Sequence, residues 1–281
     1  MTAWLDELKL EPGPPFSAMG SHSLKPDQWL IVDDDRDADL ERKAELLASV
    51  KPMVFAAEPG SEIASAEVLE LVRGWLRDHG ITPQPAAGDD HPLIEAARLV
   101  QEDLVVLERI DHAWVVRAGV VCFPTHWAIR DKVGLPLEGV HAPVAHYHQE
   151  LREKVDRFHD RLMTQSPVWR RNWFVLPTNE LHLPAFGGRL DPLTVLEPDG
   201  SPMWIRSERQ TLRRLPVSDA IVFTIRIQRA PLGVLRDRVE IARKMLAVVR
   251  SWDRTKRMYT STGGAIDALT DWLADLGARH S

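Results

Sequence analysis

Cysteine is almost absent from this sequence. A single cysteine, Cys122, stands among 281 residues, so no internal disulfide can form and no cysteine cluster can hold zinc or an iron–sulfur group. No apolar run reaches the roughly eighteen residues that a membrane-spanning helix needs. The opening MTAWLDELKLEP lacks both the basic flank and the apolar core of a signal peptide. These absences lead us to expect a cytoplasmic protein without a membrane partner.

The short motifs of the common enzyme families are also missing. The sequence contains no GxxxxGK[ST] phosphate loop, no GxGxxG after a strand-like run, no HExxH and no GxSxG. The net charge of −6 does not favour nucleic acid as a partner. Cys122 lies in an apolar run, where a free cysteine is more often an inert small side chain than a nucleophile. Histidine, arginine and carboxylate side chains are left as candidates for chemistry.

Tryptophan, in contrast, is abundant, with ten residues against two tyrosines. Its large ring suits bulky core walls, either around a planar ligand or in ordinary packing. Apolar residues make up 44% of the chain and charged residues 27%, which is typical of a globular protein. The length is sufficient to bury an ordinary hydrophobic core.

Hydrophobic periodicity predicts an α+β protein. Helical spacing occurs in residues 37–50, 61–78, 91–101, 147–163, 231–252 and 264–276. Strand-like runs occupy residues 104–108, 113–123, 173–177, 204–215 and 220–227. Two strands, helical elements and three more strands follow the order of a PAS-like fold, in which an antiparallel five-stranded sheet and its helices enclose a pocket. Other α+β architectures share this order.

No long linker or internal repeat divides the chain. We therefore expect a single domain over residues 1–281. Residues 1–100 would form an N-terminal arm and helical layer, residues 104–230 the PAS-like core, and residues 231–281 the C-terminal helices. The first thirty residues are rich in proline and glycine, which predicts an extended arm with turns rather than a packed helix.

Four of the eleven histidines, His126, His141, His146 and His148, fall within residues 119–148. Prolines at positions 136 and 143 restrict the backbone on both sides of His141, and a fixed backbone suits a metal ligand. His148 and His159 share one face of the helix expected at residues 147–163, so either could be the ligand instead. A solvated or half-buried structural role is open for all of these histidines.

The segment RSERQTLRRL, residues 206–215, is unusually polar for a strand. Side chains alternate along a strand, so Arg206, Glu208 and Gln210 would face one way and Ser207, Arg209 and Thr211 the other. The polar groups could form surface ion pairs worth about 0–1 kcal/mol each. They could equally enter a cavity, where arginine binds carboxylates and glutamate holds a cation.

Several segments occur together in one order. They are VCFPTHW at residues 121–127, KVGLPL at 132–137, VHAPV at 140–144, RRNWFV at 170–175 and RSERQTLRRLPVSDAIVFTIR at 206–226. This set resembles the heme-binding subunit of the heme-dependent oxidative N-demethylases, also described as dimethylamine monooxygenases. The resemblance covers roughly residues 16–260.

The resemblance implies a PAS-like fold with a heme pocket that holds b-type heme on a histidine axial ligand. Carried over by motif, His141 is the metal ligand and Glu208 and Arg209 are the catalytic groups. The groups implied to bind the cofactor are His141, Arg206, Arg171, Trp173 and Arg226. The implied reaction uses O2 to oxidise a methyl group of a secondary amine such as dimethylamine. Electrons would come from NADPH through a separate partner that carries flavin and iron–sulfur centres.

Two other functions fit the same residues. A heme-binding PAS-like sensor or carrier without catalytic turnover would need the pocket but no substrate, and a fold does not fix a function. The sequence contains no recognisable signalling output domain, which counts against a sensor. An interaction protein without a cofactor would carry the histidines and arginines on its surface.

Overall fold

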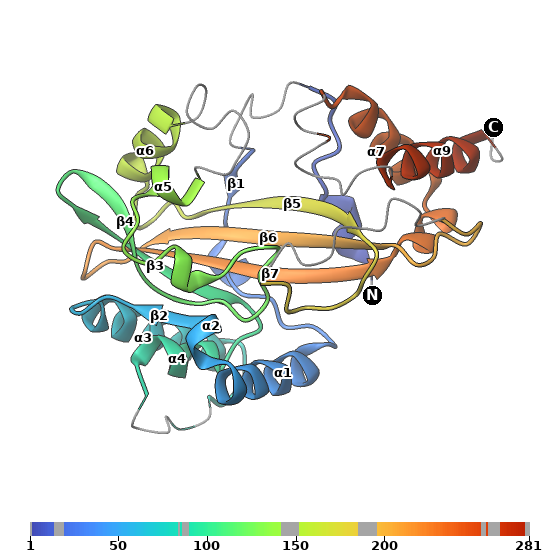
Figure 1. Ribbon diagram of the computed structural model, residues 1–281. Helices are drawn as coiled ribbons and strands as arrows, with labels where there is room; N and C mark the ends of the chain where they lie inside the picture. The colour runs from blue at the N-terminus through green and yellow to red at the C-terminus, as the bar shows by residue number, and fades with distance from the viewer. Residues whose placement is uncertain are drawn as a thin grey trace.

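A mixed arrangement of helices and one antiparallel sheet is seen in the computed structural model, which describes residues 2–13, 20–83, 85, 90–141, 152–184, 196–253, 257 and 265–278 (Figure 1). The strand order is β1-β5-β6-β7-β3-β4-β2, and every pair is antiparallel. The strands are β1 (His22–Ser23), β2 (Phe55–Ala57), β3 (Asp103–Ile110), β4 (Ala113–Val120), β5 (Val168–Leu176), β6 (Trp204–Arg214) and β7 (Ile221–Pro231).

The predicted α+β class is confirmed, but the five-stranded sheet is wrong because the described sheet has seven strands. The five expected strands are present, although β5 begins five residues before the predicted start at residue 173. The two missed strands, β1 and β2, are two and three residues long. Such short edge strands have no room for an alternating pattern, so the sequence carries no signal for them.

The described helices gather in three groups around the sheet (Figure 1). The first group holds α1 (Arg36–Ser49), α2 (Lys51–Val54), α3 (Glu62–Asp78) and α4 (Pro92–Ala97). Near one end of the long strands lie α5 (Leu137–His141) and α6 (Arg152–Arg161), with the 3-10 helix η3 (Ile129–Asp131) before them. Near the other end lie α7 (Val239–Ser251) and α9 (Ala265–Ala278), preceded by η5 (Leu232–Asp237).

The N-terminal arm is not the unpacked segment that its composition predicts. Residues Ala3–Glu7 form the 3-10 helix η1, and a second 3-10 helix, η2, spans Pro26–Gln28. Trp4, Leu5 and Leu8 are buried in one cluster with residues of α7 and α9. Burial of three large apolar side chains outweighs the weak helical tendency of this segment.

The sheet has two faces, which we name by residues of β6. The Glu208 face carries Arg206, Glu208 and Gln210, and the Arg209 face carries Ser207, Arg209 and Thr211. Apolar residues of η3, α5 and α6 form one buried cluster with Leu212, which belongs to the Glu208 face. The segment between β4 and β5 therefore covers part of the Glu208 face.

Gly119 on β4 allows η3 to approach the sheet. A Cβ at this position would lie 2.4 Å from Ile129 Cδ1 and 2.6 Å from Ile129 Cγ1, and Ile129 is buried. Gly119→Ala is therefore expected to lower the free energy of unfolding by about 1–3 kcal/mol through overpacking. Urea denaturation measures the change. Gly74→Ala in α3 is the control, since its Cβ meets nothing within 4 Å and alanine favours a helix by up to about 1 kcal/mol. Destabilisation of equal size in both variants would contradict the packing of η3 on Gly119.

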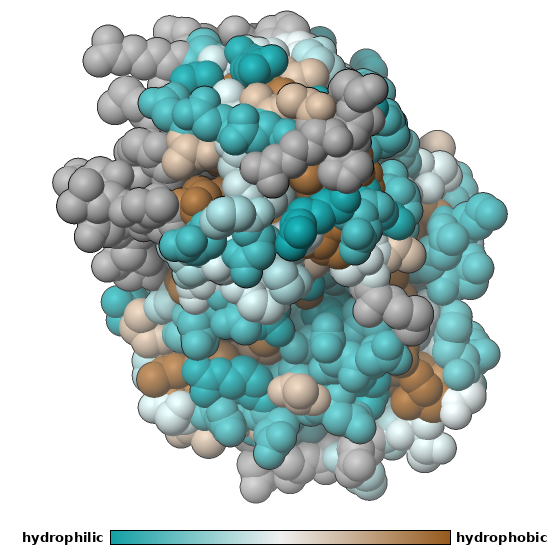
Figure 2. Space-filling model, turned by 90° about the vertical axis from the view of Figure 1, so that its right-hand side faces the viewer, coloured by the Kyte–Doolittle hydropathy of each residue, from teal (hydrophilic) through white to brown (hydrophobic). Residues whose placement is uncertain are grey.

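The surface seen from the side of α7 and α9 is mostly hydrophilic, with small scattered hydrophobic patches (Figure 2). Within the described ranges, no helix combines the length and the apolar content that a bilayer crossing requires.

Candidate functional site

The residues predicted for the site lie on both faces of the sheet. Arg206 and Glu208 belong to the Glu208 face, as expected from their alternation. Arg171, Arg209 and Arg226 are register partners across β5, β6 and β7, so they form a row on the Arg209 face. The structure therefore does not bring Glu208 and Arg209 together on one wall.

The row on the Arg209 face contacts the N-terminal part of the chain. Arg209 donates to the backbone oxygens of Gln28 and Trp29, at 2.5 and 3.2 Å. Arg226 pairs with Asp33 and with Asp39, each at 2.8 Å. Trp173, which shares this face, stacks at a tilt on Trp252, with ring centroids 5.6 Å apart. Arg171 pairs with Glu7 and donates to Ser207 and Gln228. These contacts give the row a structural role, because they hold the N-terminal segment from Glu7 to Asp39 against the sheet.

Arg206 on the Glu208 face joins two loop segments to β6. Its side chain is 1% exposed, and burial lowers the pKa of Arg206 to about 10. It donates to Thr125 Oγ1 and to four backbone oxygens, those of Phe123, Pro124, Glu180 and Leu181, at 2.8–3.2 Å. These five contacts engage most of the guanidinium's donors, which makes Arg206 a clamp. Binding of a heme propionate by Arg206 stays a prediction.

Glu208 lies in a chain of polar groups next to that clamp. Its side chain is 8% exposed, with Oε1 accepting from Thr125 Oγ1 at 2.6 Å. Its Oε2 accepts from Gln210 Nε2 at 2.9 Å, and Gln210 Oε1 accepts from Arg170 Nε at 2.7 Å. The chain Thr125–Glu208–Gln210–Arg170 thus places a carboxylate and a guanidinium on one face with an amide between them.

Arg170, one of several arginines that the sequence offers as partners for heme propionates, was not assigned to the site and lies before the strand predicted at residues 173–177. It is partly buried and stands directly opposite Gln210 in the β5–β6 register. Loss of hydration lowers the pKa of Arg170, while the Glu208 charge raises it. The positive charge of Arg170 also contributes to the lowered pKa of His141 and of His159. Arg170 is therefore an electrostatic neighbour of both histidines and of Glu208.

His141, at the end of α5, has the protonation state that a metal ligand requires. Its Nδ1 lies 2.8 Å from the Leu137 carbonyl oxygen. A carbonyl only accepts, so Nδ1 carries the proton and the lone pair stands on Nε2. Burial lowers the pKa of His141 to about 4, so the ring is neutral at physiological pH.

His159 on α6 shares these properties. Its Nδ1 donates to the Val155 carbonyl oxygen at 2.8 Å, and burial lowers the pKa of His159. The ring is 5% exposed and lies beside Trp114, with centroids 6.2 Å apart. Of the histidines predicted as ligands, His141 and His159 therefore both stay candidates, since each has the lone pair on Nε2. His182 has the same kind of hydrogen bond, from Nδ1 to the Cys122 carbonyl oxygen at 2.8 Å, and was not predicted. His146 and His148 lie outside the described residues.

Acid should destabilise the heme-free chain partly through His141. The unfolded chain binds a proton on this ring near its ordinary pKa of 6.5, whereas the folded chain binds it only near pH 4. The stabilising contribution is therefore complete above pH 6.5 and is lost as the pH falls toward 4. Between these pH values, the parent chain is expected to lose about 2–3 kcal/mol more stability than His141→Gln.

Urea unfolding at several pH values measures this difference. Burial raises the pKa of Glu102 and Asp103 and gives them the opposite slope, but that slope is common to both proteins and cancels. Parallel pH profiles for the parent and the variant would contradict a His141 ring that is kept neutral in the folded chain.

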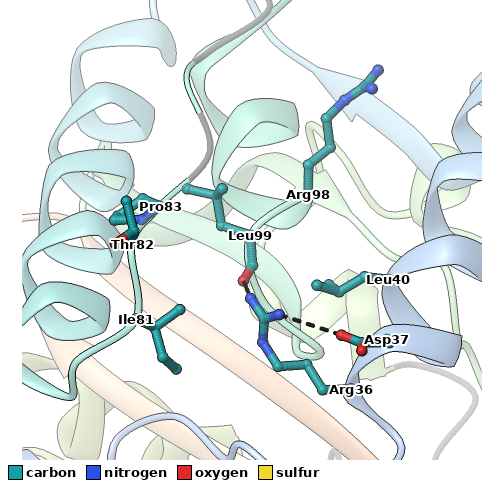
Figure 3. A pocket seen from close by; sticks show the side chains of 8 residues that line it. All are labelled: Arg36, Asp37, Leu40, Ile81, Thr82, Pro83, Arg98 and Leu99. Atoms are coloured by element: carbon teal, nitrogen blue, oxygen red, sulfur yellow. Dashed lines mark hydrogen bonds and ion pairs between the residues drawn. The ribbon is translucent and has the colours of Figure 1, made fainter.

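Neither Cys122 nor the pocket beside α1 belongs to the candidate site. Burial raises the pKa of Cys122 to about 12, so the thiol is a poor nucleophile, as predicted. A pocket of about 240 Å³ lies between α1 and the segments at residues 81–83 and 98–99. In this pocket Arg36 donates to the Leu99 carbonyl oxygen, while Arg98 points away (Figure 3). None of the candidate site residues lines it.

The side chains on the Glu208 face fit a heme by their chemistry. Heme iron takes a neutral imidazole as axial ligand, and two such rings lie beside this face. The buried cluster around η3, α5 and α6, which includes Trp114, Leu137 and Leu212, makes the surroundings of this part of the face apolar. Gln210 was placed on the same face as Glu208 by its alternation but was not assigned to the site. Thr125 was missed, because it reaches Glu208 from a segment outside β6.

A family model gives an independent indication. The model described as "Haem-dependent oxidative N-demethylase, alpha subunit-like" matches residues 77–267, more than half of the 281 residues. The matched region contains both candidate histidines and the whole polar chain from Thr125 to Gln210. The name of the family indicates dependence on heme. The chain belongs to the family of the heme-dependent oxidative N-demethylase alpha subunit-like proteins.

Proposed function

We propose that this chain is the heme-binding subunit of an oxidoreductase that uses O2 to demethylate an amine. In the balanced reaction, a secondary N-methyl amine, O2, two electrons and two protons give the primary amine, formaldehyde and water. The observation that carries the proposal is a neutral His141 whose pKa the charge of Arg170 helps to lower, where Arg170 is joined through Gln210 to the Glu208 carboxylate, all within the matched region. The proposed cofactor is b-type heme in a PAS-like pocket on the Glu208 face.

The chain's own residues would bind the cofactor and orient the amine. A bound heme would supply the activation of O2, because no side chain of the chain can do this chemistry. His141 would donate its Nε2 lone pair to the iron, and the Leu137 carbonyl would fix the ring and increase its basicity. His159 is the alternative ligand.

Glu208 would hold the protonated amine. Its carboxylate already accepts one hydrogen bond on each oxygen, from Thr125 and Gln210, which fixes its direction and leaves lone pairs for an ammonium group. The amine must lose its proton before its methyl group is oxidised, and the carboxylate is the nearest acceptor on this wall. Arg209 lies on the other face, so its proposed effect on catalysis would be indirect, through the arm.

The electrons would come from a partner protein. The chain has one cysteine and no dinucleotide motif, so it has no evident site for an iron–sulfur cluster or for NADPH. The designation "alpha subunit-like" suggests that family members act with further subunits. We propose a reductase that takes electrons from NADPH through flavin and iron–sulfur centres.

An assay of formaldehyde tests the proposed function. The chain is reconstituted with hemin and supplied with a chemical reductant, O2 and a panel of secondary N-methyl amines. Formaldehyde in proportion to the amine consumed is expected, and Glu208→Gln should lower its rate of formation. A heme-loaded chain that binds O2 but releases no formaldehyde from any amine would overturn the proposal.

A further inference from the structure

The guanidinium of Arg170 has N–H groups that could donate to an anion. Within the described residues its hydrogen bonding is confined to one donor, Nε, which is held by Gln210 Oε1 at 2.7 Å. The four N–H groups on its two terminal nitrogens therefore remain for a ligand. A guanidinium that has lost hydration gains most from a planar, bidentate anion, and a carboxylate has that shape.

Arg170 and Glu208 form a matched pair of opposite charges. Arg170 is directly opposite Gln210, and Glu208 is two residues from Gln210 on the same face. This makes Arg170 a diagonal neighbour of Glu208, at a separation of about 7–8 Å between strand positions. Gln210 bridges the pair and holds both groups in place, since it accepts from Arg170 and donates to Glu208.

One amide, that of Gln210, separates the two charged groups along the hydrogen-bonded chain, and a spacing of this kind suits a small zwitterion. In an α-amino acid the amino nitrogen and the carboxyl carbon are joined through one carbon, by bonds of about 1.5 Å each. Two charge-assisted hydrogen bonds of about 2.8 Å add the remaining reach at either end. An α-amino acid can therefore bridge Glu208 and Arg170, whereas a simple dialkylamine engages only the glutamate.

We propose that the substrate of this site is an N-methyl α-amino acid, with its ammonium group on Glu208 and its carboxylate on Arg170. This inference rests on the proposed function and narrows its substrate class. The balanced reaction converts the N-methyl amino acid, O2, two electrons and two protons into the free amino acid, formaldehyde and water. O2 is the oxidant, and the partner reductase supplies the electrons.

The carboxylate bound by Arg170 could belong either to a substrate or to a heme propionate. The substrate is favoured by the pairing with Glu208, because Gln210 hydrogen-bonds to both side chains and holds the two opposite charges beside each other on one face. The two sources give different results when Arg170 is replaced. A substrate site changes the preference among amines, and a propionate site changes the affinity for heme.

The experiment compares binding of N-methylglycine and dimethylamine to the hemin-loaded chain by isothermal titration calorimetry. The parent is expected to prefer N-methylglycine, and Arg170→Gln should reduce that preference by about 10- to 100-fold, the effect of losing hydrogen bonds to a charged group. Arg213→Gln is the control, because Arg213 lies on the Arg209 face against Trp29, and it should keep the parental preference. A parent that binds both amines equally would overturn the proposal. So would an Arg170→Gln chain that keeps the preference and instead loses affinity for hemin.

Failure of this inference can be told apart from failure of the proposed function. If the chain binds hemin and releases formaldehyde from dimethylamine but shows no preference for N-methylglycine, the inference fails and the function stands. If the chain binds no hemin, the function fails, and calorimetry on the purified chain still decides whether N-methylglycine binds through Arg170.

Discussion

Replacing His141 by alanine is expected to weaken heme binding by more than about 100-fold. Substitutions of groups that merely orient a metal ligand already cost 10- to 100-fold in metal affinity, and His141 is the proposed ligand itself. The loss should be measured by titration with hemin, followed by visible absorption. Added imidazole should restore a histidine-type spectrum in this variant, because it can occupy the position that the side chain has left.

Two matched histidine variants make this test specific. His79, the C-cap residue of α3, has the same hydrogen bond, from Nδ1 to the Trp75 carbonyl at 2.7 Å, but lies in the first helix group, away from the Glu208 face. His79→Ala should keep the parental heme affinity. His159→Ala should keep the axial signature even if packing near Trp114 is disturbed. If His159→Ala loses heme while His141→Ala retains it, His159 is the ligand.

Replacing Arg206 by methionine is expected to lower the free energy of unfolding by about 3–5 kcal/mol. The substitution retains most of the apolar stem but removes the Arg206 donor from Thr125 and from the Phe123, Glu180 and Leu181 carbonyl oxygens. The Pro124 carbonyl oxygen also loses this contact but still accepts from the Leu183 amide. Each unsatisfied buried acceptor costs about 1–3 kcal/mol, and partial relaxation keeps the total below the sum. Urea denaturation provides the measurement.

Arg130→Met is the control for Arg206. Its ion pair with Asp131 is 3.6 Å long and exposed on both sides, and such pairs contribute little. A change of less than about 0.5 kcal/mol is expected. Equal, small effects of the two substitutions would show that Arg206 does not clamp the loops, and would free its guanidinium for a cofactor.

The local spacing of apolar and polar residues predicted several strands and helices of this fold. The alternation in residues 206–215 correctly separated Glu208 from Arg209, because the period of a strand is two whichever strands lie beside it. The helices now seen as α1 and α3 were predicted within one residue at each end, because both have strong apolar spacing and polar starts.

The rest of the site depends on non-local contacts. The register between β5 and β6 places Arg170 opposite Gln210, and no property of either segment alone fixes that register. Likewise, Thr125 reaches Glu208 because residues 121–126 run beside residues 181–183, held by the hydrogen bond from His126 N to the Leu183 carbonyl. In the arginine row, Arg171 and Arg226 were assigned to the cofactor and Arg209 to catalysis, because a sequence reveals the charges but not the N-terminal segment that packs over them.

The two faces of the sheet thus have different roles. On the Arg209 face, buried arginines meet carboxylates and carbonyl oxygens of the N-terminal segment. On the Glu208 face, Arg206 is a clamp, and within the described residues Arg170 donates only through Nε, to Gln210. The central proposal is that heme binds on the second face and is ligated by a neutral histidine.

The most direct test of that proposal is a hemin titration of the purified parent chain, recorded by absorption and magnetic circular dichroism. The account predicts saturation at one heme per chain with the spectrum of a histidine ligand, and loss of that spectrum in His141→Ala. A titration that shows no saturable binding, or a bound heme whose spectrum excludes histidine, would contradict it.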